Sequence, residues 1–466
     1  MHSIPENFNG YLNIDGDVFA YHTSKTRVTL SPASRTPAEQ YACIKRLLQI
    51  NDKLPKFVYG SYQGYQVAFF INSDIRQLLF EPSCYFVTPM IIKTAGNLEY
   101  FYNQLSEPWN KFCAITFYGG NINFLHPPLN IIDHKAPFDD EFCGIKIKNS
   151  NEYTHKIKCI IDSEDVELTI SIQESTKLQN NEDILNGVFI GTLNSYIRLS
   201  FTTPKDFYSI EKYASLMRKL ISLLTMQNNV FFNIYLSQRN KDGLFYKTAD
   251  CKLFDSYQNY ATKSWPSVIL LTALKEYLPT LIARLNENVY DSILDMLPKN
   301  NIDVHRISIY DIQNLCSALE TVYNLKNTQR PKNEVIQTLK NKIKNTIAEF
   351  IDCNPGIDIY QKSTISSAFQ YLDFTLKDKI ITLYEEHKKI LDKFCSEKGL
   401  PTISSDKIGA FVKLRNQKAH GGSFELNDSA LLYYPLFMLS YICMFEDLLL
   451  PNEKFHSIAY LAFLYR

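Results

Sequence analysis

The 466-residue sequence has no excess of charge of either sign and contains little glycine. Lysine and arginine together number 49, as do aspartate and glutamate, so a strongly basic coat for binding nucleic acid is excluded. Only 16 glycines stand against 30 tyrosines and 30 phenylalanines. This composition is typical of packed cores and excludes a chain made of flexible linkers.

The sequence also lacks paired cysteines, an apolar leader and a long apolar run. No two of its ten cysteines form a CxxC pair, which argues against zinc-ribbon and thioredoxin sites. The first residues have no basic and apolar segments of a secretory signal, so we expect a cytoplasmic protein with reduced thiols. The longest apolar run, 430–445, is shorter than the ~20 residues that span a bilayer. We therefore expect a buried helix there and no membrane partner.

The first 250 residues are predicted to be rich in β-strands. Short runs of β-branched and aromatic residues recur there between turn residues. The strands expected from these runs are 27–30, 56–62, 66–71, 113–118, 159–161, 166–172, 188–191 and 230–236. Helices are expected at 37–50, 97–105 and 204–226. The expected fold class is therefore α+β, with a β-rich domain at 1–255.

Beyond residue 262 the apolar residues follow the 3.6-residue period of helices. Helices are predicted at 264–286, 309–323, 335–350, 376–394, 405–419, 431–450 and 455–463. Many helices with short connections favour an antiparallel bundle. We therefore expect a helical domain at 262–466, whose bundle occupies about 300–466.

The segment 404–422 contains the polar cluster of greatest chemical interest. On a helical wheel, Arg415 falls at the centre of an apolar stripe, where the period would place leucine. Asn416 and His420 lie four residues apart on one flank of that stripe. The stripe consists of Ile408, Phe411, Val412 and Ala419. A guanidinium, a carboxamide and an imidazole should therefore converge beside the buried face, just before the helix stop at 421–422.

Two interpretations of this cluster remain open. A charge on a buried face is costly unless it is paired or used. Arg415 could be structural and pair with a buried carboxylate, for which Glu320 is the candidate, while His420 interacts with the helix dipole. Alternatively, the three side chains form an active site. Lys413 and Lys418 flank the motif and either contact an RNA backbone or are solvated.

The sequence Arg415-Asn416-x-x-x-His420 resembles the R-x(4–6)-H signature of HEPN ribonucleases, in its R-N-x-x-x-H form. The family carries this motif late in a helical bundle, which matches its position here. A β-rich region followed by such a bundle is similar to ApeA-type proteins of bacterial anti-phage defence. The likeness to HEPN domains covers about 300–466, and over the first 250 residues the likeness concerns architecture alone.

The resemblance implies a cytoplasmic endoribonuclease that uses no metal and no cofactor. Histidine can transfer protons near neutral pH, and arginine can stabilise the charge of a phosphorane. The family pairs two motifs in a homodimer, formed here through the helical domain, and leaves 2′,3′-cyclic phosphate and 5′-hydroxyl ends. Its substrates include tRNA and other structured RNA, and a phage-derived trigger would be sensed by residues 1–255.

Other functions remain as alternatives. The helical bundle could be a non-catalytic module for RNA binding or dimerisation. Asp242, Asp250 and Lys252 faintly resemble the D…(D/E)xK arrangement of metal-dependent nucleases, although their spacing is short. His126 and His134 bracket a Pro-Pro loop, which is more typical of a polar surface loop than of a metal site.

Overall fold

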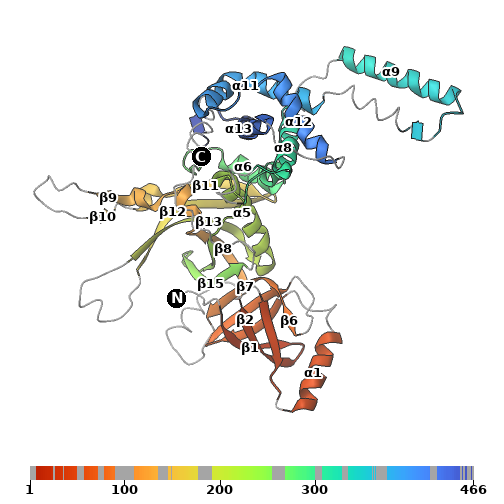
Figure 1. Ribbon diagram of the computed structural model, residues 1–466. Helices are drawn as coiled ribbons and strands as arrows, with labels where there is room; N and C mark the ends of the chain where they lie inside the picture. The colour runs from red at the N-terminus through yellow and green to blue at the C-terminus, as the bar shows by residue number, and fades with distance from the viewer. Residues whose placement is uncertain are drawn as a thin grey trace, which may run out of the picture. The chain divides into compact units, whose positions relative to one another are not determined.

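The computed structural model shows two compact units (Figure 1). The first contains Met1–Leu224, Asn229–Ala261 and Leu270–Asn286, and the second contains Thr225–Asn228, Thr262–Ile269 and Glu287–Arg466. The structure describes residues 7–24, 27–34, 36–49, 57–71, 78–89, 110–134, 145–147, 150–176, 191–253, 268–299, 307–327, 334–358, 360, 361, 363, 375–419, 428–451, 454, 457, 458 and 463.

The first unit is built on a 13-stranded sheet in which every described pairing is antiparallel. Its strand order is β11-β12-β13-β8-β14-β15-β7-β5-β4-β1-β2-β3-β6. The elements of the N-terminal part are β1 (Asn9–Ile14), β2 (Asp17–Ser24), β3 (Arg27–Pro32), α1 (Pro37–Gln49), β4 (Phe57–Tyr62), β5 (Tyr65–Ile71), β6 (Leu79–Phe80) and β7 (Pro82–Pro89).

Tight hairpins set the register of these N-terminal strands. Asp15 and Gly16 join β1 to β2, and both have positive φ, at 51° and 88°. This is the backbone that a two-residue hairpin requires, because it matches the right-handed twist of the strands. The inward side chains and α1 enclose one apolar core, which includes Phe19, Val67 and Phe69.

The remaining strands of the first unit carry a long polar face and an apolar face. The elements are β8 (Lys111–Tyr118), α3 (Ile122–Leu125), η2 (Pro128–Ile131), β9 (Ile132–His134), β10 (Ile145–Ile147), η3 (Ser150–Tyr153), β11 (His155–Ile161), β12 (Glu164–Thr176), β13 (Gly191–Asp206), η4 (Phe207–Ser209), α5 (Ile210–Thr225), β14 (Asn233–Arg239), β15 (Phe245–Leu253) and α6 (Leu278–Asn286). Ile197, Leu199 and Phe201 of β13 are buried, and the ring of Phe201 lies 4.6 Å from that of Tyr213 on α5. Because side chains alternate along a strand, Tyr196, Arg198 and Ser200 point to the opposite face.

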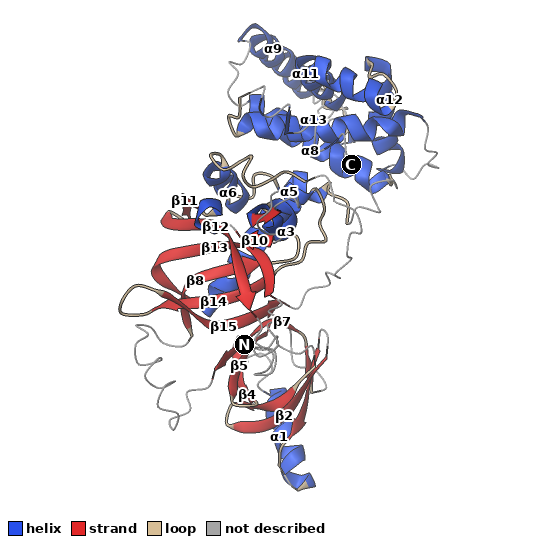
Figure 2. Cartoon of the chain, turned by 90° about the vertical axis from the view of Figure 1, so that its left-hand side faces the viewer, coloured by secondary structure: helices blue, strands red, loops and turns tan. Residues whose placement is uncertain are grey.

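The second unit is a helical bundle. Its elements are α7 (Asp291–Asp295), α8 (Ile309–Asn327), α9 (Glu334–Cys353), α11 (Leu376–Lys398), α12 (Ser405–Ala419), η7 (Asp428–Leu432) and α13 (Tyr433–Asp447). Figure 2 shows α8, α11, α12 and α13 packed together, and these helices contact one another. Thr375 and Asp378 form a capping box at the start of α11, and Gly399 ends that helix with φ 63°.

The apolar run near the C-terminus forms the centre of this bundle. Asp428–Asp447 is long and apolar enough to cross a membrane by composition, with a mean hydropathy of 1.3 over its most apolar window, and 83% of that window is buried inside the protein. The prediction of a buried helix at 430–445 is thus confirmed. Leu436, Met438 and Phe445 are fully buried because the helix is apolar on all sides.

The α+β class and most of the predicted elements agree with the structure. Two helix predictions were wrong in part. Residues 204–206 continue strand β13, and α5 begins only at Ile210. Residues 271–277 form turns before α6, and α6 packs on β11 in the first unit. The helix predicted at 97–105 and the strand residues 188–190 lie outside the described residues, and the last predicted helix is described at residues 454, 457, 458 and 463, which are helical.

Candidate functional site

Arg415 lies on α12, on the side that packs against α8. Its neighbours Ile408, Phe411 and Leu414 are buried, whereas Arg415 itself is half-buried. Burial raises the pKa of the Cys316 thiol on α8 to about 12, and the positive charge of Arg415 opposes that rise. The guanidinium therefore lies close enough to α8 to act on Cys316.

The carboxylate considered as the partner of Arg415 is bound elsewhere. Glu320 accepts a hydrogen bond of 2.5 Å from the ammonium of Lys379, which extends from α11 and also lies over the ring of Tyr323. Within the described part of the chain, Arg415 forms no ion pair. The structure thus gives Glu320 a different partner and leaves the charge of Arg415 without a described carboxylate.

The other motif residues are described only in part. The backbone of Asn416 and Lys418 is helical, because α12 continues to Ala419, but their side chains lie outside the described residues. His420 also lies outside them. Lys413 is exposed on the outer side of α12, where it is free to contact a ligand or solvent.

Sequence analysis missed a cluster of charged side chains inside the bundle. Lys326 at the end of α8 donates to Glu386 of α11 and, at 2.7 Å, to Glu446 of α13. His387 of α11 is buried and lies 3.2 Å from the same oxygen of Glu446. The signal was a set of polar residues at core positions of three separate helices, which no single helical pattern could join.

This cluster has the chemistry of a structural ion network. The donor atoms of His387, Cys443 and Glu446 all lie within 4.8 Å of one another, a spacing that a metal ion could use. Yet the ammonium of Lys326 already neutralises Glu446 and would repel a cation. Burial raises the pKa of Cys443 far above its usual range, which disfavours the thiolate that metal binding needs. Burial tends to raise the pKa of Glu446, but the hydrogen bonds from His387 and Lys326 outweigh it and lower that pKa.

The residues considered for a metal-dependent nuclease do not come together. Asp242 lies in the turn between β14 and β15, where the side chain of Asn240 binds it. Asp250 lies on β15 and pairs with Lys247 at 2.5 Å. Asp242 precedes β15, whereas Asp250 is the sixth residue of that strand. Because a strand rises ~3.3 Å per residue, the carboxylates of Asp242 and Asp250 are too far apart to bind one metal ion.

Of the two histidines around the Pro-Pro loop, the structure describes the side chain of His126. His126 is almost completely buried, with its ring 6.0 Å from that of His155. Burial and then the His155 ring lower the pKa of His126, so the ring is neutral at physiological pH. The burial of His126 contradicts the expectation of a polar surface loop at this residue, because its ring packs beside that of His155 on β11. The side chain of His134 lies outside the described residues.

No protein-family model, curated protein or solved structure matches the chain. The functional argument therefore depends on the residues themselves and on the resemblance of the motif at 415–420.

Proposed function

We propose that the protein is a metal-independent endoribonuclease of the HEPN type, with Arg415, Asn416 and His420 as its active-site residues. In this proposal it acts in the cytoplasm as an effector of anti-phage defence. It cleaves tRNA or another structured RNA and leaves 2′,3′-cyclic phosphate and 5′-hydroxyl ends. Residues 1–255 sense the phage-derived trigger.

The observation that carries the proposal is the environment of Arg415. A half-buried arginine in a helix normally has a carboxylate partner, because an unpaired buried charge is costly. Here the carboxylate expected to pair with it, Glu320, is neutralised by Lys379, and Arg415 forms no ion pair with a described carboxylate. The guanidinium therefore keeps its donors for an external anion, and a phosphodiester offers the matching oxygens.

The proposed chemistry divides the reaction between the three side chains. The 2′-hydroxyl of the RNA attacks the adjacent phosphorus and the bond to the 5′-oxygen breaks, so one proton leaves the nucleophile and one joins the leaving group. His420 transfers a proton, since imidazole titrates near neutral pH. Arg415 stabilises the charge that develops on the phosphorane oxygens, and Asn416 orients the phosphate or the imidazole.

A second copy of the chain would complete this site. The nucleophile and the leaving oxygen lie on opposite sides of the phosphorus, whereas the motif of one chain offers a single histidine. A two-fold homodimer through the helical unit supplies the other histidine, and two-fold dimers are the commonest oligomers. Helix α9 offers a surface for a second copy, because its amphipathic stripe leaves Leu339 and Phe350 56% and 58% exposed.

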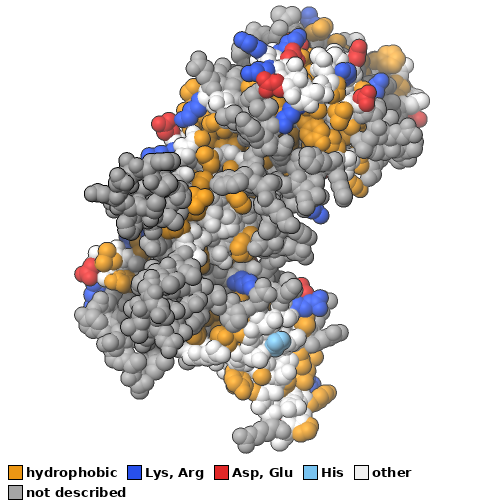
Figure 3. Space-filling model, turned by 60° about the vertical axis from the view of Figure 1, so that its left-hand side comes forward, with side chains coloured by type: hydrophobic (Ala, Val, Ile, Leu, Met, Phe, Trp, Pro, Cys, Tyr) orange, Lys and Arg blue, Asp and Glu red, His pale blue; other side chains and the backbone are white. Residues whose placement is uncertain are grey.

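The net charge of zero is consistent with an RNA site whose positive charge is concentrated in one place. On the face drawn in Figure 3, basic and acidic side chains are interspersed over the helical part instead of forming a patch of one sign. Two copies of Arg415 in one cleft would supply local positive charge that the net charge of zero does not.

The test is incubation of the purified full-length protein with total RNA in EDTA, followed by analysis of the RNA ends. We expect cleavage with 2′,3′-cyclic phosphate ends, and we expect His420→Ala and Arg415→Met to abolish it. Lys407→Met is a matched control on α12, because Lys407 contacts the backbone oxygen of Thr402 and lies outside the motif. His22→Ala removes an imidazole from the first unit, outside the motif, and is the control for His420→Ala.

The outcomes separate the competing functions. A fully active His420→Ala protein would rule out the proposed catalysis. RNA binding without cleavage, retained in folded His420→Ala, would favour the non-catalytic module. Activity that disappears in EDTA and returns with magnesium would favour a metal-dependent nuclease at another site.

A further inference from the structure

The polar face of the sheet in the first unit contains a row of aligned side chains. In five neighbouring strand pairs, the register places one residue of a strand directly opposite one residue of the adjacent strand, so that a row runs across the sheet. From β11 to β15 this row consists of Lys156, Thr169, Arg198, Thr116, Tyr235 and Asp250. The row joins residues that are up to 134 positions apart in the sequence, so no local sequence motif reveals it.

Much of this polar face is buried. Thr116 is 0% exposed, Thr169 6% and Ser171 3%, although a sheet face covered with hydroxyl groups normally faces water. A cavity of about 310 Å³ lies over these strands and is lined by residues of the row and its neighbours, including Thr169, Ser171 and Arg198. This volume is at the lower end of the range for small-molecule sites.

Arg198 is held rigidly in the wall of this cavity. Its Nε donates to Oγ1 of Thr116 at 3.1 Å, and its terminal nitrogen donates to the hydroxyl of Tyr235 at 3.2 Å. The guanidinium also lies 5.1 Å and 5.5 Å from the ring centres of Tyr196 and Phe245. Such contacts orient the planar group before any ligand arrives and leave some of its five donors unused.

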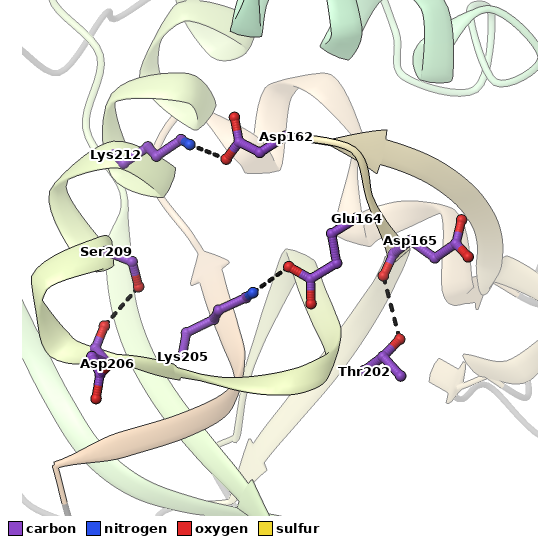
Figure 4. Close-up of polar contacts among 8 residues, drawn as sticks. All are labelled: Asp162, Glu164, Asp165, Thr202, Lys205, Asp206, Ser209 and Lys212. Atoms are coloured by element: carbon purple, nitrogen blue, oxygen red, sulfur yellow. Dashed lines mark hydrogen bonds and ion pairs between the residues drawn. The ribbon is translucent and has the colours of Figure 1, made fainter.

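Unlike Lys205 and Lys212, Arg198 has no described carboxylate partner. At the far end of the same strand, Lys205 pairs with Glu164, and Lys212 of α5 pairs with Asp162 (Figure 4). Within the described residues, no salt bridge reaches Arg198. Lys156, which also lines the cavity, approaches Glu167 only at 3.9 Å in an exposed pair, and such pairs contribute little.

A buried hydroxyl in the same wall also has no partner. Ser200 is 5% exposed, and its Oγ makes no hydrogen bond within the part of the chain that the structure describes. A buried polar group without a partner is destabilising, and a hydrogen bond from a bound ligand with a hydroxyl group would relieve that cost. Ser200 is thus an independent sign that the cavity receives a polar ligand.

We propose that this cavity binds a small phosphorylated sugar or a ligand that contains one. Arg198 and Lys156 would receive the phosphate, whose charge of about −1.5 to −2 at pH 7 suits two cations. Ser200, Thr169 and Glu167 would bind the sugar hydroxyls, because they supply both donors and acceptors. The site belongs to the first unit alone and does not depend on the proposed ribonuclease activity.

The test measures binding to the full-length protein by calorimetry, with ribose 5-phosphate as the probe. Ribose and inorganic phosphate serve as fragments, and adenosine 5′-monophosphate shows whether a base adds affinity. We expect ribose 5-phosphate to bind at least tenfold more tightly than either fragment. Tighter binding of the nucleotide would identify the source of the phosphorylated sugar as a nucleotide, and equal binding would identify a simple sugar phosphate.

Variants assign the binding to this cavity. We expect Arg198→Gln to weaken binding at least tenfold and Ser200→Ala to weaken it roughly three- to tenfold. Lys205→Gln removes a cation from the same strand outside the cavity and should leave the affinity within about twofold. If Arg198→Gln does not fold, Lys156→Gln and Ser200→Ala carry the test. Ribose that binds as tightly as ribose 5-phosphate, no binding of any probe, or variants with unchanged affinity would overturn the proposal.

Discussion

Replacement of Lys326 by methionine tests how the helical bundle is held together. The ammonium lies between Glu386 and Glu446, so one side chain of α8 joins α11 and α13. Lys326→Met keeps most of the apolar stem and removes the charge. Glu446 then keeps its interaction with His387 but loses its cation.

The expected loss follows from the burial of the three side chains. Removing one partner of a buried ion pair costs ~3–5 kcal/mol, whereas exposed pairs contribute ~0–1 kcal/mol. Lys326, Glu446 and Glu386 are 26%, 21% and 27% exposed, so solvent screens them in part. We therefore expect a loss of about 2–3 kcal/mol, which lowers Tm by roughly 4–12 °C for a unit of this size.

The assay is thermal and guanidinium unfolding followed by circular dichroism, repeated between pH 7 and pH 4. Because the folded-state pKa of Glu446 is lowered, its contribution to stability is present above the unfolded pKa of about 4.3 and is lost as pH falls through the folded value. In Lys326→Met the orphaned carboxylate takes up a proton more readily. The difference in stability between the two proteins should therefore narrow towards pH 4.

A second substitution supplies the control. Lys326→Met combined with Glu446→Gln leaves no orphaned charge at position 446, so it should be at least ~1 kcal/mol more stable than additive losses predict. Unchanged stability of Lys326→Met at pH 7, or a loss that grows towards pH 4, would refute this account of the cluster.

Three further predictions concern other parts of the protein. Because burial lowers the pKa of His126, its neutral ring contributes fully to the stability of the first unit above the unfolded pKa of about 6.5, and this contribution is lost as the pH falls below that value. Urea unfolding between pH 7.5 and 5.5 should therefore show a free energy of unfolding that decreases with falling pH. His126→Phe should make this decrease smaller. Tyr290→Phe removes a 2.6 Å hydrogen bond to Asp447 and should cost ~1.5–3 kcal/mol by denaturant unfolding, and no measurable cost would contradict that bond. Phe350→Glu on α9 should weaken the proposed homodimer at least tenfold in analytical ultracentrifugation, whereas Glu349→Gln should not, and equal dimerisation of both variants would exclude α9 as the interface.

The amino-acid sequence by itself determined the local structure of much of this protein. The 3.6-residue period set helices α8, α9, α11 and α12, because each carries an apolar stripe that the sequence already contains. In α8, α11 and α12 that stripe is buried, whereas Leu339 and Phe350 of α9 are exposed. Asp15 and Gly16, which both have positive φ, determine the tight turn of the hairpin between β1 and β2. The position of Arg415 on the inner side of α12 also followed from this period alone.

Only the tertiary structure decided which charges meet. Glu320 of α8 pairs with Lys379 of α11 instead of Arg415 of α12, because α11 also packs against α8, and no single helix pattern contains that contact. The cluster at Lys326 needs three helices, and the cavity at Arg198 needs the register of several strands. Residues 271–277 carry a helical pattern but form turns, and the amide of Leu271 donates to the carbonyl of the distant Leu125. Electrostatic pairing and cavities depend on contacts between distant segments, and a periodic pattern records only which side of its own element a residue faces.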